Sequence, residues 1–318
     1  MYEALLNLDN ADINFGTGGT LIMNIVLAFI MFGIALEIKV ADFKNVFYKP
    51  KSLLVGLTSQ LIVLPAVTFA LAAIFHDVFP PSVGMGMILL AACPGGNMSN
   101  FFTSLAKGNT ALSVSMTSIN SAIAFITTPF NFAFWGTRYV KFISRQSSDL
   151  LQPLQISIPH MLLTLTLILI IPLALGMLLS HYRPKLSKKL VKPLKTFSLL
   201  AFIGILVVAL ANNVTNFINH ITYIFVVVLI HYVAVVGAGY LLARIFRLNK
   251  PDRTAVTIET GIQNSGLGLG LMFNPRIFPA GTVTGGMLFI VAWWGIWHII
   301  AGFILVGLFR LFPLKRKK

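Results

Sequence analysis

The sequence predicts an all-α membrane protein in which nine transmembrane helices include inverted repeats. The first observation is composition: 57% of the 318 residues are hydrophobic and 10% are charged, whereas a soluble domain carries about 25% charged residues. The second is a series of apolar runs of about 20 residues or more, each long enough to cross a bilayer as a helix. The third is that two of these runs are interrupted at corresponding places.

The apolar runs define nine spans that are joined by short polar connections. The spans cover residues 19–38, 51–74, 81–107, 109–136, 154–181, 194–217, 219–246, 252–274 and 282–311. Because their number is odd, the two ends of the chain are expected on opposite sides of the membrane.

The distribution of basic residues predicts the orientation. If the N-terminus is outside, all but four of the 24 Lys and Arg residues fall on the inner side. The four exceptions are Arg138, Lys141, Arg145 and Arg276. The positive-inside rule therefore predicts a multi-pass protein of the cell (inner) membrane, with an outer N-terminal tail over 1–18 and a basic cytoplasmic tail over 312–318.

Several classes of protein are not indicated. The net charge of +15 would suit nucleic-acid binding, but Lys and Arg stand in short clusters between spans and form no basic stripe. The single cysteine, Cys93, excludes an intrachain disulfide. No Ser-His-Asp set or pair of carboxylates suggests an enzyme. No obligate protein partner is evident, so membrane lipid and small solutes are the expected partners.

The third and eighth spans are not continuous helices. The third is interrupted at Cys93–Asn100, where Pro94 removes a backbone donor, and the eighth is interrupted around Glu259 to Gly266. Backbone groups freed at membrane depth must be received by protein or by a wet cavity. A plain kink or a short loop would explain either interruption alone.

The two interruptions occur in matching members of a repeat. Spans 19–136 and 194–311 repeat at a spacing of roughly 170 residues, and the third member of each set is interrupted. An offset of five spans reverses orientation, which leaves the fifth span, 154–181, unpaired. Paired broken helices in inverted repeats are typical of secondary transporters with a site near the bilayer midplane.

Glu259 is the strongest candidate for a functional residue. It is the only carboxylate in the middle of an apolar span, where a charge costs about 2.5 kcal/mol or more. Its neighbours Thr260, Gln263, Asn264 and Ser265 all carry side-chain oxygens. Oxygens around one negative charge suit a small hard cation such as sodium.

If the two breaks cross, Ser99 and Asn100 lie close to Glu259. Ser113 and Thr117 are four residues apart and share one helix face, and Gln60 adds an amide from the second span. Half-helix N-termini attract anions and unwound carbonyls bind cations, which predicts co-transport of sodium with an anion. Alternatives remain open: Ser113 and Thr117 could bond to their own helix, Gln60 could make an interhelical hydrogen bond, and Asn97 and Asn100 could be caps.

The two interruptions closely resemble those of the bile acid:sodium symporter (BASS) family, including bacterial homologues of the sodium/bile acid cotransporters. The matching segments are Cys93–Asn100, Lys107–Ser118, Glu259–Asn264 and Gln60–Pro65. The resemblance covers essentially the whole chain. It implies a core domain with two crossed broken helices, here 51–136 and 219–311, and a flatter panel domain, here 19–38, 154–181 and 194–217.

The resemblance also implies two sodium sites and a substrate site. The first sodium site would use Ser99, Asn100, Ser113, Thr117 and Glu259. The second would use Gln60, Glu259, Gln263 and the backbone carbonyls of Thr260 and Ile262. The anionic substrate would bind between core and panel near Asn97, Asn264, Ser265 and His298. Where some bacterial relatives have His-Asn on the last helix, this chain has His298-Ile299, so a relative's substrate does not transfer directly.

The expected function is sodium-coupled symport of an organic anion by alternating access. The substrate would be a bile acid-like molecule or a smaller carboxylate such as pantoate or a keto acid. One alternative is a proton-coupled carrier or an anion exporter of the same fold. Another is a membrane receptor that binds the anion without moving it.

Overall fold

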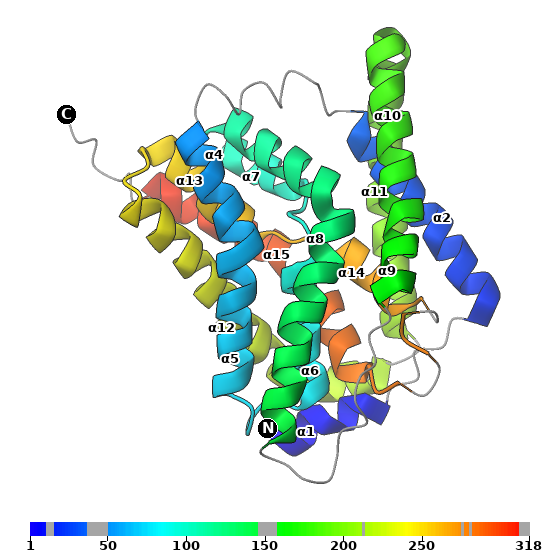
Figure 1. The fold of residues 1–318 in the computed structure, drawn as a ribbon, viewed down its shortest axis with the longest axis vertical. Helices are drawn as coiled ribbons and strands as arrows, with labels where there is room; N and C mark the ends of the chain where they lie inside the picture. The colour runs from blue at the N-terminus through cyan, green and yellow to red at the C-terminus, as the bar shows by residue number, and fades with distance from the viewer. Residues whose placement is uncertain are drawn as a thin grey trace.

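The computed structural model describes residues 1–10, 16–36, 50–145, 158–211, 214–274, 277–279 and 282–311. Every regular element in these ranges is a helix, as the sequence predicts (Figure 1). The α-helices are α1 (Tyr2–Leu6), α2 (Gly16–Ala35), α4 (Pro50–Thr58), α5 (Leu64–Ile74), α6 (Pro81–Ala92), α7 (Met98–Leu105), α8 (Thr110–Ser144), α9 (Ile158–Leu165), α10 (Ile171–Tyr182), α11 (Pro184–Ala211), α12 (Val214–Ile245), α13 (Lys250–Gly261), α14 (Ser265–Met272) and α15 (Gly285–Leu311).

Within the described ranges, five helical stretches are long and apolar enough to cross a membrane. They are Pro50–Ile74, Thr110–Ser144, Leu162–Tyr182, Ile218–Ile245 and Gly285–Leu311. Each of the nine predicted spans contains at least one helix. In the predicted N-terminal tail, α1 and the 3₁₀ turn η1 (Asn7–Asn10) bury Leu5 and Leu8. The predicted C-terminal tail, 312–318, lies outside the described residues.

Several helices begin or end outside the predicted spans, because apolarity marks only part of a helix. The predicted connection between spans 194–217 and 219–246 lies inside α12, since α11 ends at Ala211 and α12 begins at Val214. α8 continues to Ser144 and does not end at 136. Its extension carries Arg138, whose guanidinium lies 3.4 Å from the centre of the Phe134 ring and donates to the Phe134 carbonyl. α11 begins at Pro184 and not at 194, because proline suits the first helical position and its first turns are exposed and lysine-rich.

Two helices contain a widened π turn immediately before a proline. The turns are η2 (Ser59–Val63), which joins α4 to α5, and η3 (Thr166–Ile170), which joins α9 to α10. Pro65 and Pro172 follow them at the second position of the next helix. A proline ring clashes with the carbonyl four residues earlier, and a widened turn relieves that clash. In η2 the turn buries Ser59 and Gln60 against the second half of the chain.

The two broken helices have matching dimensions. α6 and α13 each have 12 residues, and α7 and α14 each have eight. Both interruptions are therefore confirmed, but both are shorter than predicted. The first covers only residues 93–97, because α7 begins at Met98. In the second, α13 continues through Gly261, so Glu259 is helical and only Ile262–Asn264 form the break.

The breaks cross and satisfy each other's backbone groups. Gly95 and Gln263 form an isolated antiparallel bridge. The Gly96 N–H donates to the Ile262 carbonyl at 2.8 Å, and the Asn264 N–H donates to the Pro94 carbonyl at 2.9 Å. Polar backbone freed inside a membrane is tolerated when protein receives it in this way. The crossing therefore fixes the two breaks against each other.

The helices form two packed groups. α2, α10 and α11 pack on one another, and in Figure 1 they stand with α9 beside the rest of the molecule. Their approach is close, since a Cβ on Gly176 of α10 would lie 2.5 Å from the Ala35 Cβ of α2. The second group contains α4, α5, α6, α8, α12, α13 and α15 with the short helices α7 and α14. The groups meet where α14 contacts α2, where α8 contacts α9 and η3, and where α11 contacts α12 and α15.

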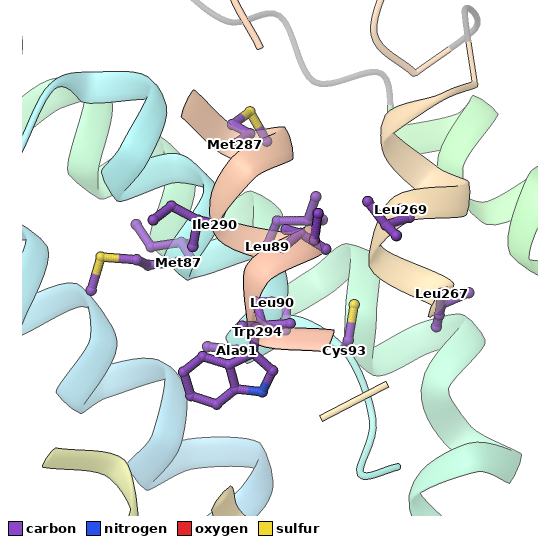
Figure 2. Close-up of a cluster of buried hydrophobic side chains, with 14 of the residues drawn as sticks. Met87, Leu89, Leu90, Ala91, Cys93, Leu267, Leu269, Met287, Ile290 and Trp294 are labelled. Carbon is purple, nitrogen blue, oxygen red and sulfur yellow. The ribbon is translucent and has the colours of Figure 1, made fainter. Parts of the chain in front are cut away.

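An apolar cluster fills the centre of the second group and extends to Leu27 of α2 and Leu169 of η3; Figure 2 shows part of it. Leu89 of α6, Leu269 of α14 and Ile290 of α15 are fully buried in it. α6 and α15 approach closely, because a Cβ on Gly86 would lie 2.7 Å from the Cα of Met287. α14 packs against both α6 and α15, so this close packing also supports α14.

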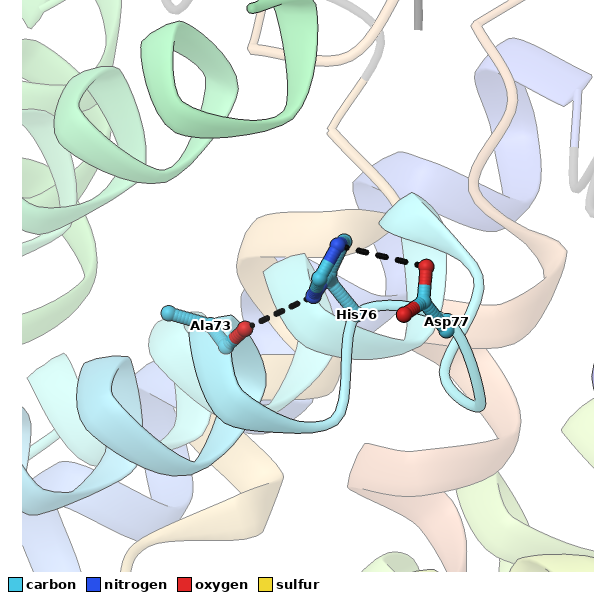
Figure 3. A network of polar contacts seen from close by, with 3 residues as sticks. All are labelled: Ala73, His76 and Asp77. Atoms are coloured by element: carbon cyan, nitrogen blue, oxygen red, sulfur yellow. Dashed lines mark hydrogen bonds and ion pairs between the residues drawn. The ribbon is translucent and has the colours of Figure 1, made fainter. Parts of the chain in front are cut away.

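The end of α5 is closed by a local polar contact (Figure 3). His76 Nδ1 lies 3.0 Å from the Ala73 carbonyl, which can only accept, so Nδ1 carries the proton. His76 Nε2 lies 3.2 Å from the Asp77 carboxylate, which also only accepts, so the two form an ion pair only when both ring nitrogens carry a proton. The Asp77 side chain is 87% exposed. An exposed pair of this kind adds at most about 1 kcal/mol, so it caps the helix and is no candidate for the functional site.

Candidate functional site

Glu259 lies in the last turn of α13, immediately before the break, and is fully buried. A carboxylate in such a place needs partners, because an unpaired buried charge costs several kcal/mol. Its partners are three hydroxyls from α7 and α8. Ser99 donates to Oε2, Ser113 donates to Oε2 at 2.9 Å, and Thr117 donates to Oε1 at 2.7 Å. One carboxylate therefore joins both broken helices to the long helix α8.

The hydroxyls reach Glu259 for reasons of helix geometry. Ser113 and Thr117 are one turn apart on the face of α8 that contacts α13. Ser99 lies in the first turn of α7, next to the break. The Thr117 hydroxyl also lies 3.0 Å from the Ser113 carbonyl. Its single proton can serve only one acceptor at a time, so a bond to its own helix and a bond to Glu259 compete.

Asn100 also belongs to this cluster. Its Oδ1 lies 3.3 Å from Thr117 Oγ1, and its side chain is only partly buried. The structure thus brings together all five residues predicted for the first sodium site. The structure also shows that three of the five, Ser99, Ser113 and Thr117, donate hydrogen bonds to the Glu259 carboxylate.

A second polar cluster lies on the other side of the break. Gln60 Nε2 donates to Gln263 Oε1 at 3.0 Å, and Ser59 and Thr260 share a hydrogen bond of 2.7 Å between their hydroxyls. A Cβ on Gly95 would lie 2.5 Å from Glu259 Oε1 and 3.1 Å from Gln60 Nε2. The two clusters are therefore adjacent and separated by little more than the glycine.

The acceptor oxygens of the second cluster differ in whether they have a hydrogen-bond partner. Gln60 Oε1 is buried and has no hydrogen-bond partner. The Thr260 carbonyl accepts from Gln263 Nε2 at 2.9 Å, and the Ile262 carbonyl accepts from the Gly96 N–H. A carbonyl oxygen has two lone pairs, so each retains one acceptor position. An unpartnered buried oxygen beside a carboxylate suits a cation better than an anion.

The short helices α7 and α14 begin at the crossing. Asn264 caps α14 by accepting from the Leu267 N–H at 3.0 Å. Asn97 precedes α7 without a side-chain capping bond. Ser265 is buried in the first turn of α14. The two N-termini place partial positive charge beside the crossing, where an anionic group would be stabilised.

His298 stands apart from these residues in its bonding. Its Nδ1 lies 2.8 Å from the Trp294 carbonyl one turn earlier in α15, and it is buried. No hydrogen bond links it to Asn97, Asn264 or Ser265 among the described residues. The predicted substrate role of His298 therefore stays a prediction.

Sequence reasoning missed Ser59 and Asp252. Ser59 is next to Gln60 in the sequence, and its hydrogen-bond partner Thr260 is next to Glu259. Its position beside a candidate residue was the signal that could have identified Ser59. Asp252 is a second buried carboxylate on α13, seven residues before Glu259 and on the same helix face. Its position near the polar end of a span gave no signal of burial.

The chemistry of the crossing is that of a hard-cation site. Its oxygen-bearing groups are one carboxylate, hydroxyls, amide oxygens and backbone carbonyls, a set that suits sodium and not a soft metal. Within the described ranges, no group of three or more His, Cys, Asp or Glu side chains could hold a metal ion. A cation at Glu259 would be held strongly, because the surroundings are apolar and exclude water.

Comparison with known proteins agrees with this chemistry. A protein-family model described as the sodium bile acid symporter family matches residues 24–220. The chain is 30% identical over 287 residues to the Bacillus subtilis (strain 168) "uncharacterized sodium-dependent transporter YocS", with 89% of this chain and 81% of that protein covered. It is 27% identical to the rat "hepatic sodium/bile acid cotransporter", with 92% and 77% covered.

Relatives from plants and mammals are longer. The chain is 28% identical to the rice "probable sodium/metabolite cotransporter BASS1, chloroplastic" and covers 65% of its length. It covers 48% of the human "P3 protein", to which it is 32% identical over 243 residues. The family model matches well over half of the chain, and the Bacillus protein matches nearly all of it. The chain belongs to the sodium bile acid symporter family.

Proposed function

We propose that this protein is a secondary active transporter that couples sodium to the movement of an organic anion by alternating access. As a member of its family it is a multi-pass, sodium-dependent membrane transporter and not an enzyme. The observation that carries the proposal is the buried carboxylate of Glu259 at the crossing of two broken helices, with Ser99, Ser113 and Thr117 directed at it. Sodium would be bound there as a co-substrate.

The two polar clusters support two adjacent sodium sites that share Glu259. The first would use the Glu259 carboxylate with Ser99, Asn100, Ser113 and Thr117. When sodium binds there, the hydroxyl groups would rotate so that their protons turn away from the carboxylate and their lone pairs face the ion. The second would use Gln60 and Gln263 with the carbonyls of Thr260 and Ile262, and the unpartnered Gln60 Oε1 supports it.

The proposed substrate is an organic anion that binds beside the crossing, between the two groups of helices. The N-termini of α7 and α14 at Asn97 and Asn264 offer positive potential to its charged group, and Ser265 offers a hydroxyl. A bile acid-like molecule or a smaller carboxylate would fit this chemistry, as the printed names of the rat and rice relatives also suggest.

The arrangement of helices supports a division into a moving core and a panel. α2, α9, α10 and α11 would form the panel, and the remaining long helices with α7 and α14 would form the core. Contacts between the groups are confined to a few elements, which suits motion of one group against the other. We propose nine membrane crossings with the N-terminus outside, as the distribution of Lys and Arg predicts.

The decisive experiment is uptake into proteoliposomes that contain the purified protein. Labelled taurocholate and labelled pantoate are offered with an inward gradient of sodium or of potassium. Accumulation that requires sodium is the expected result. Uptake that follows a pH gradient and ignores sodium would establish the proton-coupled alternative, and saturable binding without accumulation would establish the receptor.

Replacing Thr117 with valine is expected to raise the sodium concentration for half-maximal uptake about tenfold, since one ligand lost from a charged site costs about 1.4 kcal/mol. The shape of the side chain is kept. The matched control is Thr127→Val on the same helix, whose hydroxyl bonds to the Ile123 carbonyl of its own helix. Equal sodium dependence in the two variants would remove Thr117 from the site.

A further inference from the structure

Helix N-termini meet in pairs at the two ends of the core. At one end, upper in Figure 1, the N-terminus of α8 meets that of α13, because the Asn109 N–H donates to the Pro251 carbonyl at 2.9 Å. At the other end, the N-terminus of α15 meets that of α6, because a Cβ on Gly286 would lie 3.0 Å from the Val83 backbone nitrogen. Each pair concentrates the positive ends of two helix dipoles.

A buried carboxylate lies at the first pair. Asp252, in the first turn of α13, is 2% exposed. Asn109 Nδ2 donates to its Oδ1 at 2.7 Å, while Ser52 Oγ at 2.7 Å and Asn249 Nδ2 at 3.1 Å donate to its Oδ2. Both oxygens of the carboxylate thus face donors, and the donors come from α4, α8 and the cap of α13. Asp252 joins three helices at one point.

A carboxylate from a different part of the chain lies at the second pair. Asp9 of η1 accepts from the Gly286 N–H at 3.0 Å, in the first turn of α15. The Ser82 hydroxyl of α6 lies beside the same carboxylate without completing a well-directed hydrogen bond. Burial raises the pKa of Asp9, and Ser82 and the Gly286 N–H act in the opposite direction. At the α6/α15 pair the carboxylate thus comes from the N-terminal segment, whereas at the α8/α13 pair it comes from α13 itself.

The inverted repeat relates these two arrangements. α6 and α7 correspond to α13 and α14, and α8 corresponds to α15, so the two pairs of N-termini are equivalent positions on opposite faces. Beyond the carboxylates Asp252 and Asp9, the two repeats differ in the contacts that follow. Along α6 and α15 the next contacts are apolar and include Leu89, Ile290 and Trp294. Along α8 and α13 they are the hydroxyls and carboxylate of the proposed sodium site.

Asp252 lies in register with that site. Asp252 and Glu259 are seven residues apart on one face of α13, and Asn109, Ser113 and Thr117 follow at intervals of four on the facing side of α8. The Asn109–Asp252 bond therefore sets the register in which α8 presents its hydroxyls to Glu259. The segment formed by α4 and η2 follows the same pattern, with Ser52 of α4 bonded to Asp252 and Ser59 of η2 bonded to Thr260.

We propose that Asp252 is a positioning residue that sets sodium affinity by holding α8 and α4 in register with Glu259, and that Asp9 is its counterpart at the α6/α15 end. The inference rests on the proposed function, because it assumes that sodium binds at Glu259. Asp9 anchors an apolar interface, so its loss leaves sodium affinity unchanged. Asp252 does not touch the ion.

The proposal is tested by exchanging the side chains of the hydrogen-bonded pair Asn109 and Asp252. Asn109→Asp sets a carboxylate against Asp252 and is expected to raise the sodium concentration for half-maximal uptake tenfold or more. The double variant Asn109→Asp/Asp252→Asn reverses the hydrogen bond. The amide introduced at position 252 donates to the carboxylate introduced at position 109, while its oxygen still accepts from Ser52 and Asn249. Sodium dependence is therefore expected to return to within about threefold of wild type. Asp9→Asn is the control.

Sodium binding is measured in parallel, without transport, as the sodium-dependent rise in the thermal unfolding midpoint of the purified protein. Unchanged sodium dependence in Asn109→Asp, or a double variant worse than that single variant, would overturn the proposal. If Asn109→Asp does not fold, Ser52→Ala removes one donor and is expected to raise the half-maximal concentration severalfold; no change overturns the proposal. If wild type shows no sodium effect in either assay, the proposed function itself fails.

Discussion

Substituting Glu259 with glutamine is expected to abolish sodium-driven accumulation of the anion. The substitution keeps the shape of the side chain and one acceptor oxygen but removes the carboxylate charge at the crossing. Sodium would then lose its counter-charge in surroundings that exclude water, where the interaction between charges is strong. We expect at least a hundredfold rise in the sodium concentration for half-maximal uptake, equivalent to about 2.7 kcal/mol.

The experiment needs a control for the loss of a carboxylate as such. Glu3→Gln removes a carboxylate from the exposed side of α1 and is expected to leave uptake unchanged. Both proteins are purified, and their elution in size-exclusion chromatography and their helix content are compared with wild type. If folded Glu259→Gln protein retains normal sodium-dependent uptake, Glu259 is not a sodium ligand and both proposed sites lose their shared residue.

The features that could be predicted from the sequence are those in which one residue type has few structural options. Pro94 removes a backbone donor and the two glycines after it relax the backbone, a combination that favours a break, so the first break was predictable to within a few residues. Glu259 stood out because a carboxylate in an apolar span has few uses. Ser113 and Thr117 are four residues apart, which placed them on one helix face. In the structure both donate hydrogen bonds to Glu259.

The features that could not be predicted depend on tertiary contacts. Asp252 and its partners Asn109 and Ser52 are 143 and 200 residues apart in sequence, and each is a common residue near the end of a span. Asp9 is 277 residues from Gly286. The lengths of α8 and α11 were missed because hydropathy reports the part of a helix inside the membrane and not where its hydrogen bonds end.

Crossing two breaks at one point imposes a size limit that the sequence alone does not reveal. Gly95 is packed between the two polar clusters, and neither Glu259 nor Gln60 leaves room for a side chain there. The limit arises from space and not from backbone conformation. The narrow crossing is thus part of the binding geometry, because it brings the shared carboxylate within reach of both clusters.

Adding a single methyl group at this point tests that argument. Gly95→Ala would place a Cβ 2.5 Å from Glu259 Oε1 and 3.1 Å from Gln60 Nε2. The carboxylate must move or the crossing must open, at a cost of about 1–3 kcal/mol, which corresponds to a roughly tenfold to hundredfold loss of sodium affinity. The measurement is sodium-dependent uptake together with the sodium-induced rise in the unfolding midpoint.

The matched control is Gly237→Ala on α12, where an added Cβ would meet no atom within 4 Å. That variant is expected to retain wild-type uptake, since alanine favours a helix over glycine. A folded Gly95→Ala protein with wild-type sodium affinity would mean that Glu259 and Gln60 have room to separate. The two polar clusters would then not share one carboxylate, and the second sodium site would have to be built from Gln60 and Gln263 without Glu259.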